Sequence, residues 1–146
     1  GEAWGAIVDG EIAGAGVWLP PGSYPPGSGR QARQMLHLLA VVPVAMGSLY
    51  RALKYLRAVE AEHPTAEHWY LATLGVDPVH QGRGYGNRLL DAVLKRTDEA
   101  GMPTYLETDK ERNLAYYARH RFTQMDTIVP TEGAPPTWTM WRNAIS

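Results

Sequence analysis

Three glycines at positions 82, 84 and 86 alternate with other residues and form the segment of this sequence best suited to chemistry. They follow an apolar run, 68–76, that is typical of a strand, and they lead directly into an amphipathic pattern that is typical of a helix. Glycine lets successive backbone N–H groups converge on one point, and a helix N-terminus adds the positive end of its dipole. The sequence therefore predicts a site for a phosphate or pyrophosphate, with Arg83 in the loop as a further donor.

The spacing of this loop discriminates between phosphate ligands. A mononucleotide P-loop ends in Gly-Lys-Ser or Gly-Lys-Thr, whereas this loop ends in Tyr85-Gly86-Asn87. The dinucleotide fingerprint has two residues between its second and third glycines, and here Tyr85 alone separates Gly84 from Gly86. The spacing disfavours both sites, and a nucleotide-binding domain of another kind stays a remote alternative.

The run from Gln81 to Gly86 resembles the pyrophosphate loop of the GNAT superfamily, the acyl-CoA-dependent N-acetyltransferases, whose pattern is Gln/Arg-x-x-Gly-x-Gly/Ala. The segment 112–122 resembles the family's Asn-x-x-x-Tyr-x-x-x-Gly-Phe segment, and the run from His68 to Pro78 resembles its fourth strand. The resemblance covers residues 65–142 well and 1–64 loosely. Within the family, the sequence is most similar to small-molecule amine acetyltransferases of the puromycin-acetyltransferase type.

The resemblance implies acetyl-CoA as cosubstrate, no metal, and direct acetyl transfer to a primary amine of a small molecule. It implies that Asn113 contacts the cosubstrate and that Tyr117 donates a proton to the departing thiolate; a tyrosine of the core is the other interpretation of Tyr117. The residues expected to bind the cosubstrate are Leu74, Gly75, Val76, Gln81, Gly82, Arg83, Gly84, Tyr85, Gly86, Asn113 and Tyr117.

Gly75 suits a β-bulge at residues 74–76 that would free a backbone N–H for the developing oxyanion, although simple close packing would also explain a glycine there. Arg121 departs from the family pattern, which has a glycine with positive φ at this helix end. Arg121 must therefore accept a strained backbone, or the helix must end in another way.

Two residues are candidates for the general base that deprotonates the amine. Glu107 lies at the centre of an expected strand and could act directly or through a water, or it could be a hydrogen-bonded strand glutamate. His68 has an ordinary pKa near neutrality but lies toward the far end of its strand. The other histidines lack metal-ligand spacing and are interpreted as surface or cap residues. They are His37, His63, His80 and His120.

The elements expected to position these residues follow from periodicity and from turn residues. They are strands at 3–8 and 12–19, helices within 30–63, a strand at 68–76, a helix after the glycine loop, a strand at 104–108, a helix at 112–122, and strands at 122–130 and 137–142. This order predicts an α/β (α+β) fold, with a GNAT-like mixed, mostly antiparallel sheet flanked by helices. The family's N-terminal strand and helices are missing, so we expect residues 1–146 to be a single acyl-CoA N-acyltransferase (GNAT) domain that is N-terminally truncated.

The composition sets limits on the function. The chain of 146 residues is 45% hydrophobic and 20% charged, with a net charge of −1 and no cysteine. This balance does not favour nucleic acid, and the apolar stretch 36–46 is too short to cross a membrane and is interpreted as a buried or pocket-lining helix. Absence of cysteine excludes thiolate catalysis and fits a cytoplasmic protein. We expect a small-molecule amine as the partner, with a homodimer as an open alternative.

Two other function classes remain open on the sequence. A non-catalytic acyl-CoA sensor would keep the glycine loop without turnover. A protein or peptide N-acetyltransferase would have a long open groove in place of a pocket closed by the loop 20–29. Five residues fall in the region that would face an acceptor, although core packing is their ordinary role. They are Trp4, Trp18, Tyr24, His37 and Met46.

Overall fold

The computed structural model describes residues 1–24, 46–129 and 133–145. Its elements are β1 (Glu2–Val8), β2 (Glu11–Leu19), α2 (Met46–Ala61), β3 (Trp69–Val76), the 3-10 turn η1 (Pro78–His80), α3 (Tyr85–Glu99), β4 (Thr104–Thr108), α4 (Arg112–Arg119), β5 (Thr123–Ile128) and β6 (Thr137–Arg142). This order matches the expected one, apart from small differences at the ends of elements. The predicted buried or pocket-lining helix 36–46 and most of the loop 20–29 lie outside the described residues, as does His37.

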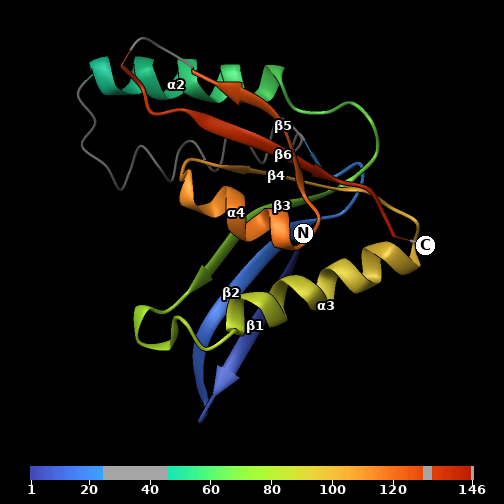
Figure 1. Cartoon of the computed structure of the whole chain (residues 1–146). Helices are drawn as coiled ribbons and strands as arrows, with labels where there is room; N and C mark the ends of the chain where they lie inside the picture. Colours follow the sequence, from blue (N-terminus) through green and yellow to red (C-terminus); the bar gives the residue numbers. More distant parts are fainter. Residues whose placement is uncertain (25–45, 130–132, 146) are drawn as a thin grey trace.

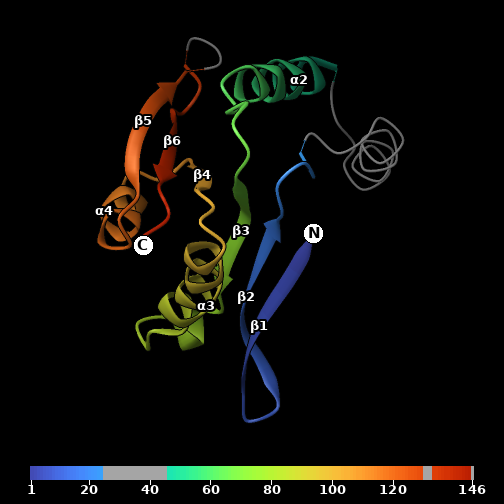
Figure 2. The same cartoon turned by 90° about the vertical axis from the view of Figure 1, so that its right-hand side faces the viewer.

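Six strands form one sheet in the order β1-β2-β3-β4-β6-β5. Every neighbouring pair is antiparallel except β3 and β4, which are parallel. Helix α3 packs against β1, β2 and β3, and α4 packs against β5 (Figures 1 and 2). The predicted mixed, mostly antiparallel sheet flanked by helices is therefore confirmed.

The predicted hairpin at Asp9-Gly10 is also confirmed. Both residues have positive φ, 52° and 85°, and the strands pair from Val8 and Glu11 onward. Two left-handed residues give the backbone twist that a two-residue hairpin loop needs. The hairpin thereby forms one edge of the sheet, with β1 outermost.

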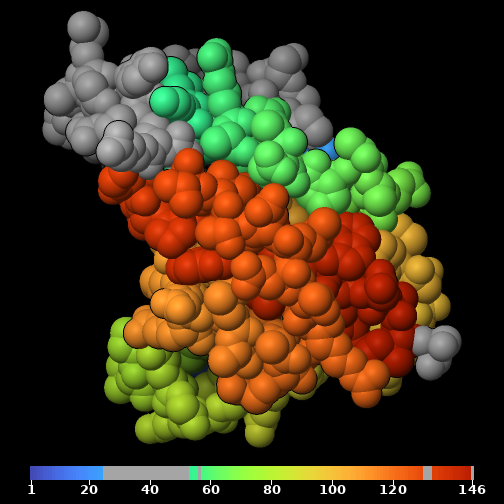
Figure 3. All heavy atoms as spheres, turned by 45° about the horizontal axis from the view of Figure 1, so that its top comes forward, coloured from blue at the N-terminus to red at the C-terminus, as the bar shows by residue number. Residues whose placement is uncertain are grey.

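Helix α2 closes the other end of the molecule. The Tyr55 and Thr137 hydroxyl oxygens are 2.9 Å apart, which links α2 to the start of β6. Figure 3 shows α2 lying directly against β5 and β6 on one face. None of the helices that the structure describes is long and apolar enough to cross a membrane.

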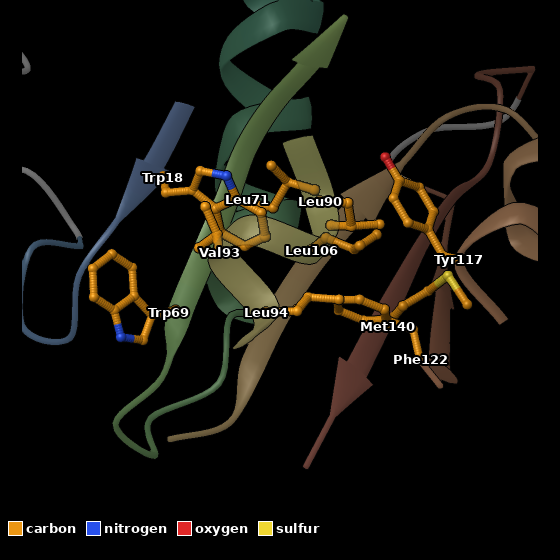
Figure 4. Close-up of a cluster of buried hydrophobic side chains, with 10 residues drawn as sticks. All are labelled: Trp18, Trp69, Leu71, Leu90, Val93, Leu94, Leu106, Tyr117, Phe122 and Met140. Atoms are coloured by element: carbon orange, nitrogen blue, oxygen red, sulfur yellow. The ribbon is translucent and has the colours of Figure 1, made fainter. Parts of the chain in front are cut away.

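The hydrophobic core lies between α3 and the sheet. Leu90, Val93 and Leu94 share one face of α3 and meet Leu71 and Leu106 of the two central strands (Figure 4). Trp18, one of the five residues in the region that would face an acceptor, is fully buried in this cluster. Its ordinary role, core packing, is therefore the correct one, because its strand position points at α3 rather than at an acceptor.

Candidate active site

The two central strands separate after three residue pairs. In the parallel pairing of β3 with β4, Trp69, Tyr70 and Leu71 face Thr104, Tyr105 and Leu106, and no further pair forms although both strands continue. Beyond Leu71, the edge of β3 that faces β4 has no partner among the described strands. Its N–H and C=O groups are therefore available to a ligand that enters between the strands.

The predicted bulge at residues 74–76 is wrong in its position. Gly75 pairs in regular register with Ala15, and the register between β2 and β3 shifts instead between Val17 and Trp18, which face Thr73 and Leu71. The unpaired residue of β3 is therefore Ala72. An extra residue bends a strand and increases its twist, and Ala72 lies where β3 leaves β4. Close packing does not explain Gly75 either, because a Cβ on it would meet nothing within 4 Å in the described part of the chain.

The glycine loop turns the chain from β3 into α3. Asp77 accepts a hydrogen bond from the N–H of Val79 at 2.8 Å, which starts the turn η1. Gly82 and Gly84 follow with φ of 75° and 81°, and Gly84 caps α3 with no side-chain hydrogen bond at that helix end. The first N–H groups of a 15-residue helix therefore keep their donors free beside an open loop.

A groove of about 670 Å³ joins this loop to the exposed edge of β3 and to α4. It is lined by Leu74, Gly75, Val76, Gln81, Gly82, Gly84, Gly86, Asn87, Lys110, Arg112, Asn113, Tyr116, Tyr117 and Arg119. Nine of the eleven residues predicted to bind the cosubstrate are thus brought together. Arg83 and Tyr85 are not among the lining residues: Arg83 is exposed, and the ring of Tyr85 packs near His80 at 6.0 Å.

The groove has a positive side that the sequence analysis missed. Lys110, Arg112 and Arg119 line it, and no acidic residue of the described chain does. All three basic residues lie on or just before α4. Their closeness in sequence to Asn113 is the feature from which a basic wall of the groove could have been predicted. Three cations opposite free helix N–H groups suit a polyphosphate.

Tyr116 was interpreted as a packing residue, and it also lines the groove. Its hydroxyl oxygen is buried without a hydrogen-bond partner and lies 3.1 Å from where a Cβ on Gly86 would be. A larger residue at 86 would therefore crowd this hydroxyl. An unpaired buried hydroxyl has an unmet hydrogen bond, which an occupant of the groove can supply.

Helix α4 presents Tyr117 to the groove and ends in a Schellman motif. The N–H of Phe122 donates to the Tyr117 carbonyl at 3.2 Å, and the N–H of Arg121 donates to the Ala118 carbonyl at 3.0 Å. Arg121 has a φ of 65° and so adopts the left-handed conformation that favours glycine. Of the two outcomes expected for Arg121, the strained backbone is the one observed. The Tyr117 and Phe122 rings pack edge to face at 5.9 Å, which fixes the position of Tyr117.

The Tyr117 side chain carries a proton at any ordinary pH. Burial, with a smaller effect of the neighbouring Tyr116, raises the pKa of Tyr117 to about 12. Figure 4 shows its ring at the border of the core with the oxygen directed away from the other side chains. A phenol in this state can donate a proton to a stronger base such as a leaving thiolate.

A second cavity of about 310 Å³ adjoins the groove. Tyr117, Leu74, Asn113 and Lys110 line both spaces, and Glu107 lines the second one alone. One carboxylate oxygen of Glu107 accepts a hydrogen bond from the Tyr70 hydroxyl at 3.0 Å. The other is buried with no hydrogen-bond partner among the residues that the structure describes. A candidate base and a candidate acid therefore lie on the walls of one cavity.

His68 is not brought to the groove or to the second cavity. It is buried, its Nδ1 lies 2.6 Å from the Ala66 carbonyl oxygen, and its Nε2 lies 3.1 Å from Nε2 of His63. Its place before the first residue of β3 puts it at the opposite end of that strand from the glycine loop. His68 therefore has no direct access to an acceptor in the second cavity.

Comparison with known proteins gives this arrangement a family. The model of the acetyltransferase (GNAT) family matches residues 1–122. The chain belongs to the acetyltransferase (GNAT) family. A stretch of 63 residues is 33% identical to an uncharacterized N-acetyltransferase of Schizosaccharomyces pombe, and this match spans 43% of the chain and 26% of the relative.

Solved GNAT structures share the fold at low sequence identity. A polyamine N-acetyltransferase of Drosophila melanogaster aligns with a TM-score of 0.65 and 21% identity over 97% of this chain and 74% of that one. An agmatine N-acetyltransferase aligns with a TM-score of 0.68 and 21% identity, covering 97% of this chain and 73% of the other. A structure described as histone acetyltransferase and related acetyltransferase, from Corynebacterium glutamicum, aligns with a TM-score of 0.65 and 21% identity. The alignment covers 96% of this chain and 62% of that one.

Proposed function

We propose that this chain is an acetyl-CoA-dependent N-acetyltransferase that transfers the acetyl group directly to a primary amine of a small molecule. The observation that carries the proposal is the position of Tyr117, which lines both the basic, glycine-rich groove and the cavity that contains Glu107. Family membership supports the choice of acyl donor. We also propose that residues 1–146 act as one such domain; a cytoplasmic location, a homodimer and a puromycin-acetyltransferase type of acceptor stay predictions.

The residues of the groove fit the diphosphate of coenzyme A. The N–H groups around Gly82 and Gly84 and at the start of α3 would hold the phosphate oxygens, and Arg112 would supply opposite charge. The unpartnered Tyr116 hydroxyl and the free edge of β3 are the other groups ready to bind. When bound, the cosubstrate supplies an activated acyl group as a thioester.

Glu107 and Tyr117 divide the proton transfers between them in this proposal. An alkyl ammonium with a pKa near 10 is neutral in roughly one molecule in a thousand at pH 7, so deprotonation costs about 4 kcal/mol. The Glu107 carboxylate would accept this proton, and Tyr117 would protonate the sulfur that leaves. Both side chains are held in place, Glu107 by Tyr70 and Tyr117 by its packing on Phe122.

The second cavity supports a compact cationic acceptor. Its volume of about 310 Å³ lies at the small end of ligand sites, and its walls carry two carboxylates, Glu107 and Asp109, against one cation, Lys110. Tyr55 and Tyr70 add apolar faces to it. The fold likeness to agmatine and polyamine acetyltransferases makes agmatine and spermidine suitable first probes.

A free-thiol release assay with acetyl-CoA and a panel of agmatine, spermidine, puromycin and amino-terminal peptides tests the proposal. We expect turnover with at least one small amine, and a kcat about a hundredfold lower in Tyr117→Phe, while the calorimetric Kd for coenzyme A changes less than twofold. Tight coenzyme binding with no thiol release from any amine would favour the sensor. Turnover of peptides alone would favour the protein N-acetyltransferase, and a Tyr117→Phe variant with normal kcat would remove Tyr117 from the chemistry.

A further inference from the structure

Behind Glu107, two histidines form a buried chain that the proposed mechanism has not used. Nδ1 of His63 lies 3.5 Å from Oε1 of Glu107, and Nε2 of His63 lies 3.1 Å from Nε2 of His68. His63 follows α2 in the sequence, and its interpretation as a surface or cap residue is wrong, because its side chain is only 7% exposed. A continuous line of ionisable groups thus leads away from the acceptor cavity.

The Ala66 carbonyl fixes the positions of the hydrogens when both histidines are neutral. A carbonyl oxygen only accepts, so Nδ1 of His68 must carry the hydrogen that it donates over 2.6 Å. Nε2 of a neutral His68 is then an acceptor, and Nε2 of His63 must be the donor. A neutral His63 therefore presents the lone pair of its Nδ1 to Oε1 of Glu107.

The gap between His63 and Glu107 has a place for one proton. Nδ1 of His63 and Oε1 of Glu107 are both buried without a hydrogen-bond partner in the described part of the chain. If Glu107 is ionised and His63 is neutral, two lone pairs face each other across 3.5 Å. A proton taken up by Glu107 would satisfy both atoms at once, because its O–H could then donate to His63.

Aromatic rings enclose this chain, and the other carboxylates near it are Glu60, which acts on Tyr24, and Glu67, which lines the same small cavity as His68. The Tyr24 ring stacks on His63 at 3.8 Å, and Tyr70 and Tyr105 meet its edges at 5.1 Å and 4.8 Å. Burial, followed by the Glu107 carboxylate, raises the pKa of both Tyr70 and Tyr105, so that these hydroxyls stay neutral. Burial, followed by the Glu107 carboxylate, also raises the pKa of the Tyr24 hydroxyl, and Glu60 has a weaker effect in the same direction.

His68 connects the chain to a separate opening. It lines a cavity of about 120 Å³ with Leu19, Tyr24 and Thr65, and Glu107 is not among the residues there. Burial is the main cause that lowers the pKa of His68, which keeps the ring neutral near pH 7 and leaves Nε2 to accept the hydrogen bond from His63. The chain thus runs from the acceptor cavity to a second, smaller cavity.

Building on the proposed acetylation, we propose that His63, held by its hydrogen bond to His68, forms a proton relay with Glu107 in each turnover. The acceptor ammonium loses one proton to Glu107, which passes it to Nδ1 of His63; the doubly protonated His63 keeps its Nε2 hydrogen bond to His68, and the proton returns through Glu107 to solvent when the products leave. The neutral amine forms the N–C bond as the C–S bond breaks, and Tyr117 protonates the sulfur and regains its proton from the amide nitrogen. The balance is one free thiol, one amide and one released proton.

The first test measures the histidine tautomers of the resting protein. In nitrogen-15 NMR spectra of histidine-labelled wild type at pH 7.0–8.0 we expect His63 to carry its proton on Nε2 and His68 on Nδ1, with both rings neutral. In Glu107→Gln we expect the His63 Nδ1 resonance to shift. A His63 that is doubly protonated in this range would overturn the relay, because no lone pair would then face Glu107. This outcome does not depend on whether acetylation is detected.

The second test separates proton transfer from positioning. His63→Asn keeps an amide that can hydrogen-bond Glu107 but cannot carry a proton, and His63→Phe keeps only the ring on Tyr24. With agmatine and acetyl-CoA as probes, we expect both variants to lower kcat at least tenfold at pH 7, with an unchanged KM for acetyl-CoA. The matched control is His120→Asn, a histidine that lines neither the groove nor the acceptor cavity, and its kcat should stay within twofold.

Two results of these kinetics would be decisive. If His63→Asn keeps the wild-type kcat and pH profile while His63→Phe loses activity, His63 only positions Glu107 and the relay is wrong. If wild type releases no thiol with any amine, the proposed function fails, and the NMR measurement then still decides whether the proton gap exists.

Discussion

Asp98 of α3 and Arg142 of β6 form a two-point ion pair, in which each guanidinium Nη lies 2.7 Å from one carboxylate oxygen. Arg142 is 4% exposed, and its Nε also donates to the His120 carbonyl at 3.0 Å. One side chain therefore joins α3, the end of α4 and β6. Because α3 and α4 carry opposite walls of the groove, this pair sets their spacing at the end remote from the glycine loop.

Replacing Asp98 should destabilise the protein strongly. Asp98→Asn leaves a buried guanidinium without its counter-charge, and we expect the free energy of unfolding to fall by about 3 kcal/mol. The measurement is urea unfolding followed by circular dichroism. Glu99→Gln on the same helix is the control: Glu99 and Lys95 are 4.0 Å apart and well exposed, so its loss should cost no more than about 0.5 kcal/mol. Equal effects of the two substitutions would contradict this role for Asp98.

The ion pair of Asp98 with Arg142 should make the free energy of unfolding depend on pH in the acid range. Hydrogen bonds from Arg142, the main cause, hold the pKa of Asp98 below its usual range. Its stabilising contribution is therefore complete above the unfolded carboxyl pKa of about 3.9 and is lost as the pH falls through the lower folded value. We expect the difference in unfolding free energy between wild type and Asp98→Asn to be constant from pH 5 to 7 and to shrink below pH 4. A difference that grows on acidification would exclude this assignment.

Arg121→Gly should stabilise the protein. Arg121 adopts a φ of 65° at the end of α4, and a residue with a Cβ pays about 1 kcal/mol for this conformation whereas glycine does not. We expect the melting temperature to rise by a few degrees. Arg121→Ala removes the same charge but retains a Cβ, so it should not give this gain. If both variants behave alike, the charge of Arg121 and not its backbone decides the effect.

Local residue patterns were sufficient to predict most of the fold. The hairpin at Asp9-Gly10 follows from turn chemistry, and α3 follows from apolar residues spaced three and four apart. Side-chain orientation within the core was less accessible, because Trp18 could face either side of an edge hairpin until the position of α3 was known. The bulge also depends on tertiary structure: Gly75 is the residue that suggests a bulge, yet Ala72 is the unpaired one.

Gly14→Ala in β2 should distort the groove by displacing β3, the strand that lines it. A Cβ on Gly14 would lie 2.9 Å from the Gly75 carbonyl oxygen, so β2 and β3 would have to move apart at the strand that lines the groove. We expect a loss of about 1–3 kcal/mol in unfolding free energy and weaker binding of coenzyme A in calorimetry. Gly5→Ala in the neighbouring strand is the control, since its Cβ would be 4.0 Å from the nearest atom. Coenzyme affinity that is unchanged in Gly14→Ala would show that β3 tolerates this shift.

Gly84→Ala should lower the affinity for coenzyme A more than it lowers the stability of the fold. Gly84 has a φ of 81° at the start of α3, and a methyl group there strains the backbone whose N–H groups face the groove. We expect a Kd for coenzyme A at least tenfold higher by calorimetry. Gly10→Ala in the hairpin is the matched control, because its φ of 85° carries the same strain far from the groove. Equal Kd values for the two variants would mean that the glycine loop does not bind the coenzyme.

The parts of the candidate site that come from one continuous sequence segment could be predicted. The glycine loop and Asn113 with Tyr117 are local patterns, and each pattern brings its residues to the groove. The chain of His63, His68 and Glu107 could not be found in this way, because the two histidines lie between α2 and β3 while Glu107 lies in β4, and these segments meet only in the folded structure. Arg83 is a case of the opposite kind: it lies inside the sequence motif, yet it is exposed and does not line the groove.

The short seam between β3 and β4 gives the bound coenzyme a mechanical role. The sheet connects its two halves there through three residue pairs, and the groove has one wall on each half. A molecule held by both walls would bridge the two halves of the sheet at the pairing with the fewest residue pairs. Amide hydrogens of Ala72 to Val76 should therefore exchange more slowly once the coenzyme is bound, and heat resistance should rise with its concentration, as mass action requires.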